Sequence, residues 1–168
     1  KNCARKALRK ELKLSKKIKI ALCVGRIVSY RRQDFLIEAF AKQKVIKNLV
    51  LLIVGEPDYS VPSTKNLVMK INKILKNSNN KIKLLGQRND IFKIMLGSDF
   101  LVHPTDMEGF GLALVEAMYT GLPIIASKVE AIPEIVPKSG NILFEKDNKK
   151  LLIRSILKVS KMSQYKLD

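Results

Sequence analysis

Short apolar runs alternate along the chain with segments whose apolar residues recur at helical spacing. The runs are bounded by glycine, proline or polar residues and predict strands over 18–24, 49–54, 81–85, 100–102, 123–126 and 141–144. The helical stripes predict helices over 36–41, 67–75, 91–96, 112–119 and 151–159. Strands that alternate with helices form βαβ units, which need a parallel sheet and right-handed crossovers. The predicted fold is therefore a three-layer α/β/α, Rossmann-like, doubly wound parallel sheet of about six strands.

The start of the chain differs from the rest. Residues 4–14 predict a basic amphipathic helix that leads into the first strand, and we interpret this helix as a linker more than as core. The predicted organisation is a lead-in helix over 1–17 and one domain over 18–168. Since the chain starts at Lys1 and not at a methionine, we expect it to be a piece of a longer protein.

The composition is that of one globular domain, with 168 residues of which 46% are hydrophobic and 28% charged. A domain of this size buries roughly 70% of its unfolded surface and needs no disulfide or metal to fold. Two cysteines, Cys3 and Cys23, cannot form a disulfide framework, so we expect the reduced thiols of a cytoplasmic protein. No apolar stretch approaches the ~20 residues of a membrane-spanning helix.

The charge balance is strongly basic, with 32 Lys and Arg residues against 15 acidic residues and a net charge of +17. Such a surplus is typical of proteins that bind nucleic acid, an anionic membrane surface or phosphate-bearing ligands. Lysines scattered over solvated helix faces give the same total. Nucleic acid is the least favoured partner, because aromatic residues make up only 6% of the chain and tryptophan is absent.

Two arginines follow the first predicted strand, at the edge of the sheet where ligands bind in this fold. Gly25 allows the backbone to turn directly before Arg26, and Arg32 comes shortly before the next helix. A guanidinium group offers planar, bidentate donors that suit phosphate oxygens. The alternative is that both arginines are solvated surface charges.

A glycine loop follows the fourth predicted strand. Gly109 and Gly111 flank Phe110 just before the helix that begins at Leu112. Free amides at a helix N-terminus form a phosphate cradle, and the helix dipole adds roughly 0.5–2 kcal/mol toward an anion.

Two glutamates accompany this loop. Glu108 precedes the loop and has no evident structural role, whereas Glu116 lies in the helix, where complementing the helix dipole is the simpler explanation.

Several other chemistries are excluded by the motifs that the chain lacks. His103 is the single histidine, so a Cys/His metal site cannot form, and no pair of spaced aspartates suggests a divalent cation. The chain has no Gly-x-Ser-x-Gly elbow, no Walker lysine loop and no Gly-x-Gly-x-x-Gly after its first strand. Hydrolase, P-loop and dinucleotide functions are therefore not expected.

Taken together, the motifs resemble the C-terminal, donor-binding domain of a retaining glycosyltransferase of family 4, which has the GT-B fold. The core of the resemblance is Glu108-Gly-Phe-Gly with a second glutamate, Glu116, followed by alanine and methionine. The flanking segments that carry it further are Val24-Gly25-Arg26-Ile27, Arg32-Gln33-Asp34, Leu36–Phe40, Leu85-Gly86, Gly121–Ala126 and Pro133–Val136.

The resemblance implies a role for each site residue. Arg26 and Arg32 would bind the donor diphosphate, and Glu108 would lie against the transferred sugar. The distal phosphate and sugar would be held by backbone amides of the glycine loop, around Gly109, Phe110, Gly111 and Leu112. Glu116 would bind the ribose, and Gly25 would shape the turn after the first strand. The base would face Gly86, Gln87 and Arg88. In the family the second cation is usually a lysine followed by glycine, and here Arg32-Gln33 replace that pair. Only Gly55-Glu56-Pro57 remains of the usual glycine-rich turn after the second strand.

The resemblance also implies a function. The expected reaction moves a hexose from a nucleotide diphosphate sugar to a glycan or lipid-linked acceptor, with retention and without a metal or other cofactor. Expected products are surface polysaccharide, lipopolysaccharide or glycolipid, made in the cytoplasm, with the enzyme peripheral on the inner, anionic face of the membrane. The acceptor half would be the protein's own N-terminal GT-B domain, so the fragment alone would be inactive. The alternatives are a non-catalytic nucleotide- or polyanion-binding module, and an epimerase or phosphorylase relative.

Overall fold

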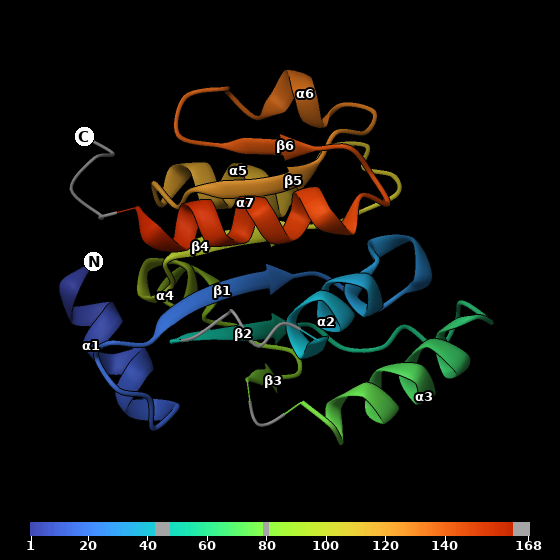
Figure 1. Ribbon diagram of the computed structural model, residues 1–168, viewed down its shortest axis with the longest axis horizontal. Helices are drawn as coiled ribbons and strands as arrows, with labels where there is room; N and C mark the ends of the chain where they lie inside the picture. Colours follow the sequence, from blue (N-terminus) through green and yellow to red (C-terminus); the bar gives the residue numbers. More distant parts are fainter. Residues whose placement is uncertain (43–47, 79–80, 163–168) are drawn as a thin grey trace.

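The computed structural model describes residues 1–42, 48–78 and 81–162 and contains one six-stranded parallel sheet in the order β3-β2-β1-β4-β5-β6 (Figure 1). Its strands are β1 (Lys19–Val24), β2 (Leu49–Val54), β3 (Ile82–Leu84), β4 (Phe100–His103), β5 (Ile124–Ser127) and β6 (Ile142–Phe144). The chain order reverses between β1 and β4, which lie side by side at the centre of the sheet. In an open α/β sheet this reversal is where ligands bind, at the carboxyl ends of the strands.

Helices cover both faces of the sheet, so the predicted three-layer fold is confirmed. They are α1 (Asn2–Glu11), α2 (Gln33–Lys42), α3 (Thr64–Leu75), α4 (Ile91–Gly97), α5 (Leu112–Tyr119), α6 (Ile132–Ile135) and α7 (Lys149–Lys161), with a 3₁₀ turn, η1 (Ser29–Arg31). The turn η1 and the short α6 were not expected from the sequence, because neither is long enough to show a helical period.

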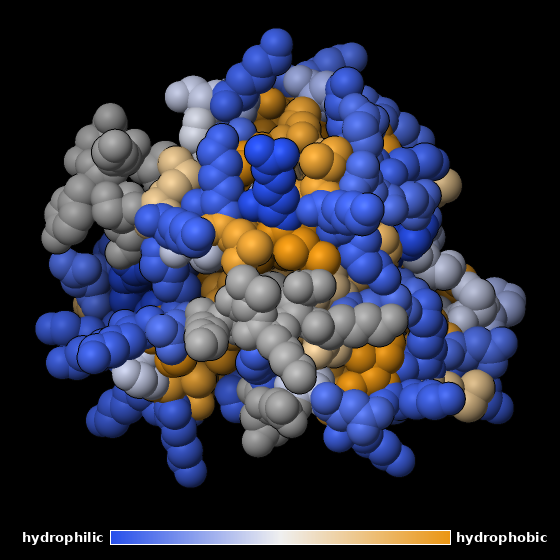
Figure 2. Space-filling view, in the orientation of Figure 1, coloured by the Kyte–Doolittle hydropathy of each residue, from blue (hydrophilic) through white to orange (hydrophobic). Residues whose placement is uncertain are grey.

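The core has two halves because strand side chains alternate between the faces. Ala21 and Cys23 of β1 join the cluster that contains α2, α3 and α7, whereas Ile20 and Leu22 join the cluster that contains α1, α4, α5 and α6. All six residues of β2 are buried, as expected of a strand covered on both faces. The face seen in Figure 2 is largely hydrophilic, with apolar patches exposed among the hydrophilic residues.

The helix at the start of the chain belongs to the core, which corrects our interpretation of it as a linker. Leu8 is only 4% exposed and packs in the same cluster as α4 and α5. A Cβ atom at Gly97 would lie 2.7 Å from the Leu8 side chain, so the glycine is what allows α1 to lie against α4. The amphipathic pattern was read correctly, but its apolar face is covered by this domain. A domain boundary at residue 17 stays a prediction.

Within the residues that the structure describes, no helix is both long and apolar enough to cross a membrane.

Candidate functional site

Two hollows meet at the carboxyl end of β1, and Val24 and Gly25 line both of them. The first has a volume of about 440 Å³ and extends toward the glycine loop; the second, of about 450 Å³, extends toward the ends of β2 and β3. A Cβ atom at Gly55 would lie 2.1 Å from the carbonyl oxygen of Gly25, so only glycine fits where these two strand ends approach each other. The hollows therefore occupy the expected place in the fold.

A buried carboxylate, that of Glu108, organises the first hollow. Its Oε2 lies 2.7 Å from Nε2 of His103 and forms an ion pair with Arg31, while its Oε1 accepts a 3.0 Å hydrogen bond from the Gly111 amide. The hydrogen bond from His103 and the guanidinium of Arg31 lower the pKa of Glu108 to about 2. Because this carboxylate is ionised at neutral pH, Nε2 of His103 must carry the proton.

The glycine loop has a conformation that requires glycine at its last position. Gly111 has φ +68°, and a Cβ atom there would lie 2.8 Å from the Leu114 side chain. α5 begins at the next residue; its N-cap, Gly111, has no side chain to cap the first turn, and the Glu108 carboxylate accepts from the amide of Gly111 itself. The first amides of a helix have no partner within it, so this end presents donors and a partial positive charge to the hollow.

The structure brings Arg31, and not Arg32, to this hollow. Arg31 lines it and contacts Glu108, whereas Arg32 lines neither hollow. The Arg32 guanidinium pairs with Asp106 at 3.0 Å and with Asp147 at 2.7 Å.

The backbone distinguishes Arg31 from Arg32. Arg32 has φ +52°, the left-handed conformation that glycine prefers. If the glycine of the lysine–glycine pattern is left-handed, Arg32 would occupy its place and Arg31 that of the lysine; this assignment stays a prediction. Gln33, which we had placed at the glycine, is buried, and its Nε2 donates a 2.8 Å hydrogen bond to the Arg26 carbonyl. This hydrogen bond thus ties the start of α2 to the loop that follows β1.

The second hollow combines Arg26 with the chain that follows β3. The Arg26 side chain is 66% exposed and pairs with Asp58, whose pKa is lowered mainly by hydrogen bonds from Ser60 and further by this arginine. Gln87 and Arg88 lie across the same hollow, and Arg88 is held by Asp90 at 2.8 Å.

The predicted site residues are therefore divided between the two hollows. Those in the first are Gly25, Glu108, Phe110, Gly111, Leu112 and Glu116; those in the second are Gly25, Arg26, Gln87 and Arg88. Three others, Arg32, Gly86 and Gly109, line neither hollow. Gly86 lies behind the second, where its carbonyl accepts a 2.8 Å hydrogen bond from Gly55. The roles assigned to all of these residues stay predictions.

Three site residues were missed from the sequence. Arg31 could have been found by placing the glycine of the family pattern at Arg32. His103, 3% exposed, was considered only as a metal ligand, although it directly precedes the loop that carries Glu108. Glu130 reaches the site from the loop after β5, where its carboxylate accepts a hydrogen bond from the Glu108 amide. Sequence spacing gives no signal for that contact.

A metal site was not expected. Among the described residues, no group of three or more His, Cys, Asp or Glu side chains could hold a metal ion. Metal independence of the reaction stays a prediction.

Known proteins with similar sequences include several glycosyltransferases. N-acetyl-alpha-D-glucosaminyl L-malate synthase of Bacillus anthracis is 29% identical over 132 residues, which cover 77% of this chain and 32% of that protein. An uncharacterized glycosyltransferase of Methanocaldococcus jannaschii is 32% identical over 145 residues, covering 81% and 41%. The UDP-Gal:alpha-D-GlcNAc-diphosphoundecaprenol alpha-1,3-galactosyltransferase of Escherichia coli is 35% identical over 109 residues, covering 63% and 27%. The chain thus spans less than half the length of each of these relatives.

Solved structures share the fold. Anabaena HepE, crystallised in complex with UDP and glucose, superposes with a TM-score of 0.84 at 24% identity over 99% of this chain and 45% of that one. WaaG, a glycosyltransferase involved in lipopolysaccharide biosynthesis, has a TM-score of 0.76 at 23% identity, with 98% and 44% covered. These neighbours have the GT-B architecture, and the present sheet matches one Rossmann-like part of it. The family described as "Glycosyl transferases group 1" matches residues 4–167, and the chain therefore belongs to the group 1 glycosyl transferases.

Proposed function

We propose that this chain is the donor-binding part of a retaining, metal-independent hexosyltransferase that uses a nucleoside diphosphate sugar. The observation that carries the proposal is the first hollow, in which Arg31 and the N-terminus of α5 adjoin the buried carboxylate of Glu108. The arrangement has the size of a small-molecule site and offers cationic and amide donors at one end of the sheet. It is suited to a ligand with two linked phosphates.

The proposed mechanism follows from the charge of the leaving group. Cleavage of the bond between sugar and diphosphate leaves extra negative charge on the phosphate oxygens, and fixed positive groups lower the free energy of that state. Arg31, Arg26 and the α5 amides would supply this field, and Arg31 takes the role that the sequence had given to Arg32. The acceptor would attack the face from which the diphosphate departs, through an oxocarbenium-like transition state.

The carboxylates would position the donor. Glu108 keeps Arg31, His103 and the Gly111 amide in one arrangement, so it would fix the phosphate-binding groups and present its edge to the sugar hydroxyls. Glu116 lines the same hollow and would accept hydrogen bonds from the ribose. In the second hollow, Gln87 and Arg88 would face the base.

We propose that a preceding GT-B domain supplies the acceptor site, because the chain spans only 32% of the length of its Bacillus anthracis relative. The Escherichia coli relative is named for a diphosphoundecaprenol-linked acceptor, and WaaG for lipopolysaccharide biosynthesis. A glycan or lipid-linked acceptor, used on the cytoplasmic, anionic face of a membrane, fits these relatives and the net charge of +17.

Calorimetric titration of the 168-residue chain with UDP, GDP and ADP tests the proposal. HepE was crystallised with UDP, so we expect UDP to bind most tightly, with the same affinity in Mg²⁺ and in EDTA. Binding that requires Mg²⁺ would contradict the metal-independent mechanism. A non-catalytic polyanion-binding module would instead bind the three nucleotides alike, and its affinity would fall steeply with salt.

A further inference from the structure

A third hollow, of about 580 Å³, opens at the opposite end of the sheet, where the strands begin. Its described lining comes from α1, from the turn that follows α1, from the start of β1 and from Asp99, which directly precedes β4. β1 begins at Lys19 and reaches the donor hollows only at Val24, about 17 Å further along the strand. This hollow is therefore separate from the donor site.

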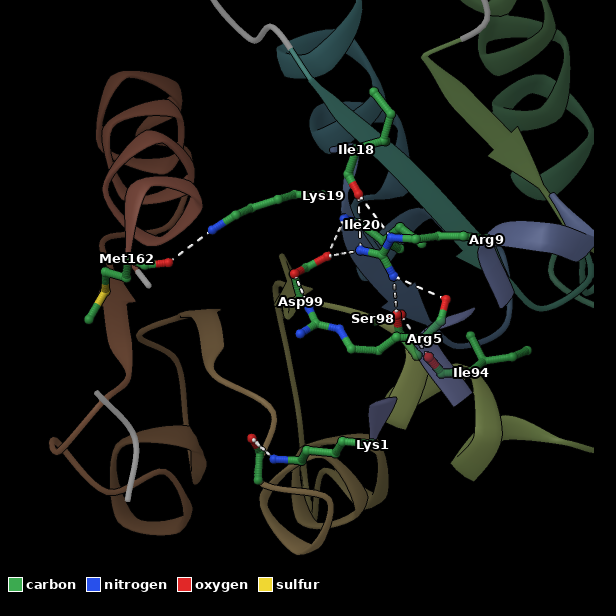
Figure 3. A network of polar contacts seen from close by, with 12 residues as sticks. Lys1, Arg5, Arg9, Ile18, Lys19, Ile20, Ile94, Ser98, Asp99 and Met162 are labelled. Carbon is green, nitrogen blue, oxygen red and sulfur yellow. Dashed lines mark hydrogen bonds and ion pairs between the residues drawn. The ribbon is translucent and has the colours of Figure 1, made fainter. Parts of the chain in front are cut away.

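Cations greatly outnumber acids in this lining. Seven of the described lining residues are Lys or Arg, and Asp99 is the one carboxylate among them. Figure 3 shows how that carboxylate is used: the guanidinium groups of Arg5 and Arg9 converge on it, and it also accepts a 2.7 Å hydrogen bond from the Ile20 amide. Asp99 is thus shared by two arginines of the lining.

Four lysines around the hollow have no ion pair within the described part of the chain. Lys6, Lys10, Lys16 and Lys17 are exposed, and none of the four forms an ion pair with a residue that the structure describes. Lys19 points away from Asp99 and donates a 2.9 Å hydrogen bond to the Met162 carbonyl, which is a neutral acceptor (Figure 3).

This arrangement has a cost in the free protein. Lys6 and Lys10 stand one helical turn apart on α1, a spacing at which like charges repel. An anion bound between them would remove that repulsion and add attraction.

We propose that this basic hollow binds a compact ligand with clustered phosphate groups, such as a polyphosphate or the polyphosphate end of a nucleotide. Ammonium groups on flexible stems bind phosphate as point charges, and several of them can converge on one compact anion. The volume lies within the range of small-molecule sites. No aromatic side chain is among the described lining residues, so stacking of nucleic-acid bases has no platform here.

Titration of the chain with sodium tripolyphosphate tests this proposal, and a parallel titration of Arg31→Gln distinguishes this hollow from the donor site. The substitutions Lys10→Gln and Lys17→Gln, made together, should weaken tripolyphosphate binding at least about tenfold, because two of the converging charges are lost. The matched control is Lys65→Gln with Lys73→Gln, two exposed lysines on α3 with no ion pair to a described residue; this pair should change the affinity less than about twofold. All four positions are exposed, and equal thermal midpoints would verify that both variants fold.

Four outcomes would overturn the proposal. The first is that tripolyphosphate does not bind. The second is that the substitution of either lysine pair weakens its binding equally, which would assign the binding to the net charge of the chain. Loss of binding on Arg31→Gln with full binding in the Lys10→Gln, Lys17→Gln protein would place the anion in the donor hollow. Binding to phosphatidylglycerol vesicles without binding of soluble tripolyphosphate would assign the lysines to a lipid surface.

Discussion

The two ends of the sheet are both rich in cations, but they are compensated differently. At the carboxyl end each arginine has a carboxylate of its own: Arg26 pairs with Asp58, Arg31 with Glu108, Arg32 with Asp106 and Arg88 with Asp90. At the amino end Asp99, the one carboxylate among the described residues that line the hollow, pairs with two arginines, and the surrounding lysines have no ion pair with a described residue.

This difference separates two ways of using positive charge. At the carboxyl end a phosphate must share or replace carboxylate partners that already hold the arginines in place, so binding there selects geometry. At the amino end the two arginines are ion-paired with Asp99 and have a structural role, so the exposed lysines are the cations available to an anion. We therefore expect selectivity at the first end and salt-sensitive, less selective attraction at the second.

The largest effect on the free energy of unfolding is expected when the carboxylate of Asp99 is removed from the amino end of the sheet. Asp99→Asn should lower the free energy of unfolding by about 3 kcal/mol or more, since it leaves the Arg9 guanidinium, 9% exposed, without a counter-charge. The measurement is urea denaturation followed by circular dichroism. Asp34→Asn is the matched control. Asp34 pairs with Lys70, which is 51% exposed, so its substitution should lower the free energy of unfolding by less than about 1 kcal/mol. Equal losses in the two variants would contradict a structural role for Asp99.

Acid should weaken the carboxyl end through Glu108. Its pKa in the folded chain is about 2, below the ordinary value of 4.5, so the ionised carboxylate stabilises the fold fully above about pH 5 and loses that effect as the pH falls toward 2. The linkage corresponds to about 2 kcal/mol lost between pH 7 and pH 3.

Comparison with Glu108→Gln isolates this contribution, because Glu38, whose pKa a hydrogen bond from Lys149 also lowers to about 2, titrates in both proteins. The difference in unfolding free energy between wild type and variant should shrink from pH 7 to pH 3. A constant difference would show that Glu108 does not titrate in this way.

The smallest of these effects distinguishes two neighbouring arginines. Arg31→Gln should weaken UDP binding about tenfold, or about 1.4 kcal/mol, because Arg31 lines the first hollow. Arg32→Gln should weaken it less than about threefold, since this side chain pairs with Asp106 and Asp147 outside both hollows. Calorimetric titration of the two variants with UDP measures both affinities. The reverse order would restore the role that the sequence alone assigned to Arg32.

Much of the fold could be predicted because its signals are local. Six apolar runs predicted the six strands, and their alternation with helical stripes predicted the parallel sheet. The strand ends then indicated where to search, and Gly25, Arg26 and Glu108 lie there. Residue order along a loop was less informative, because counting positions could not reveal that the backbone of Arg32 is left-handed.

The sequence by itself determined the sheet, the glycine loop and the surplus of positive charge, since hydrophobic period, glycine and residue counts act locally or add up over the chain. Only the tertiary structure decided which charges meet. His103 approaches Glu108 from the end of β4 and Glu130 from the loop after β5, and Asp99 joins α1 to the start of β4 over about ninety positions of sequence. Such contacts depend on how strands and helices are stacked, because a side chain's partner is set by distance in space, which no local pattern of residues encodes.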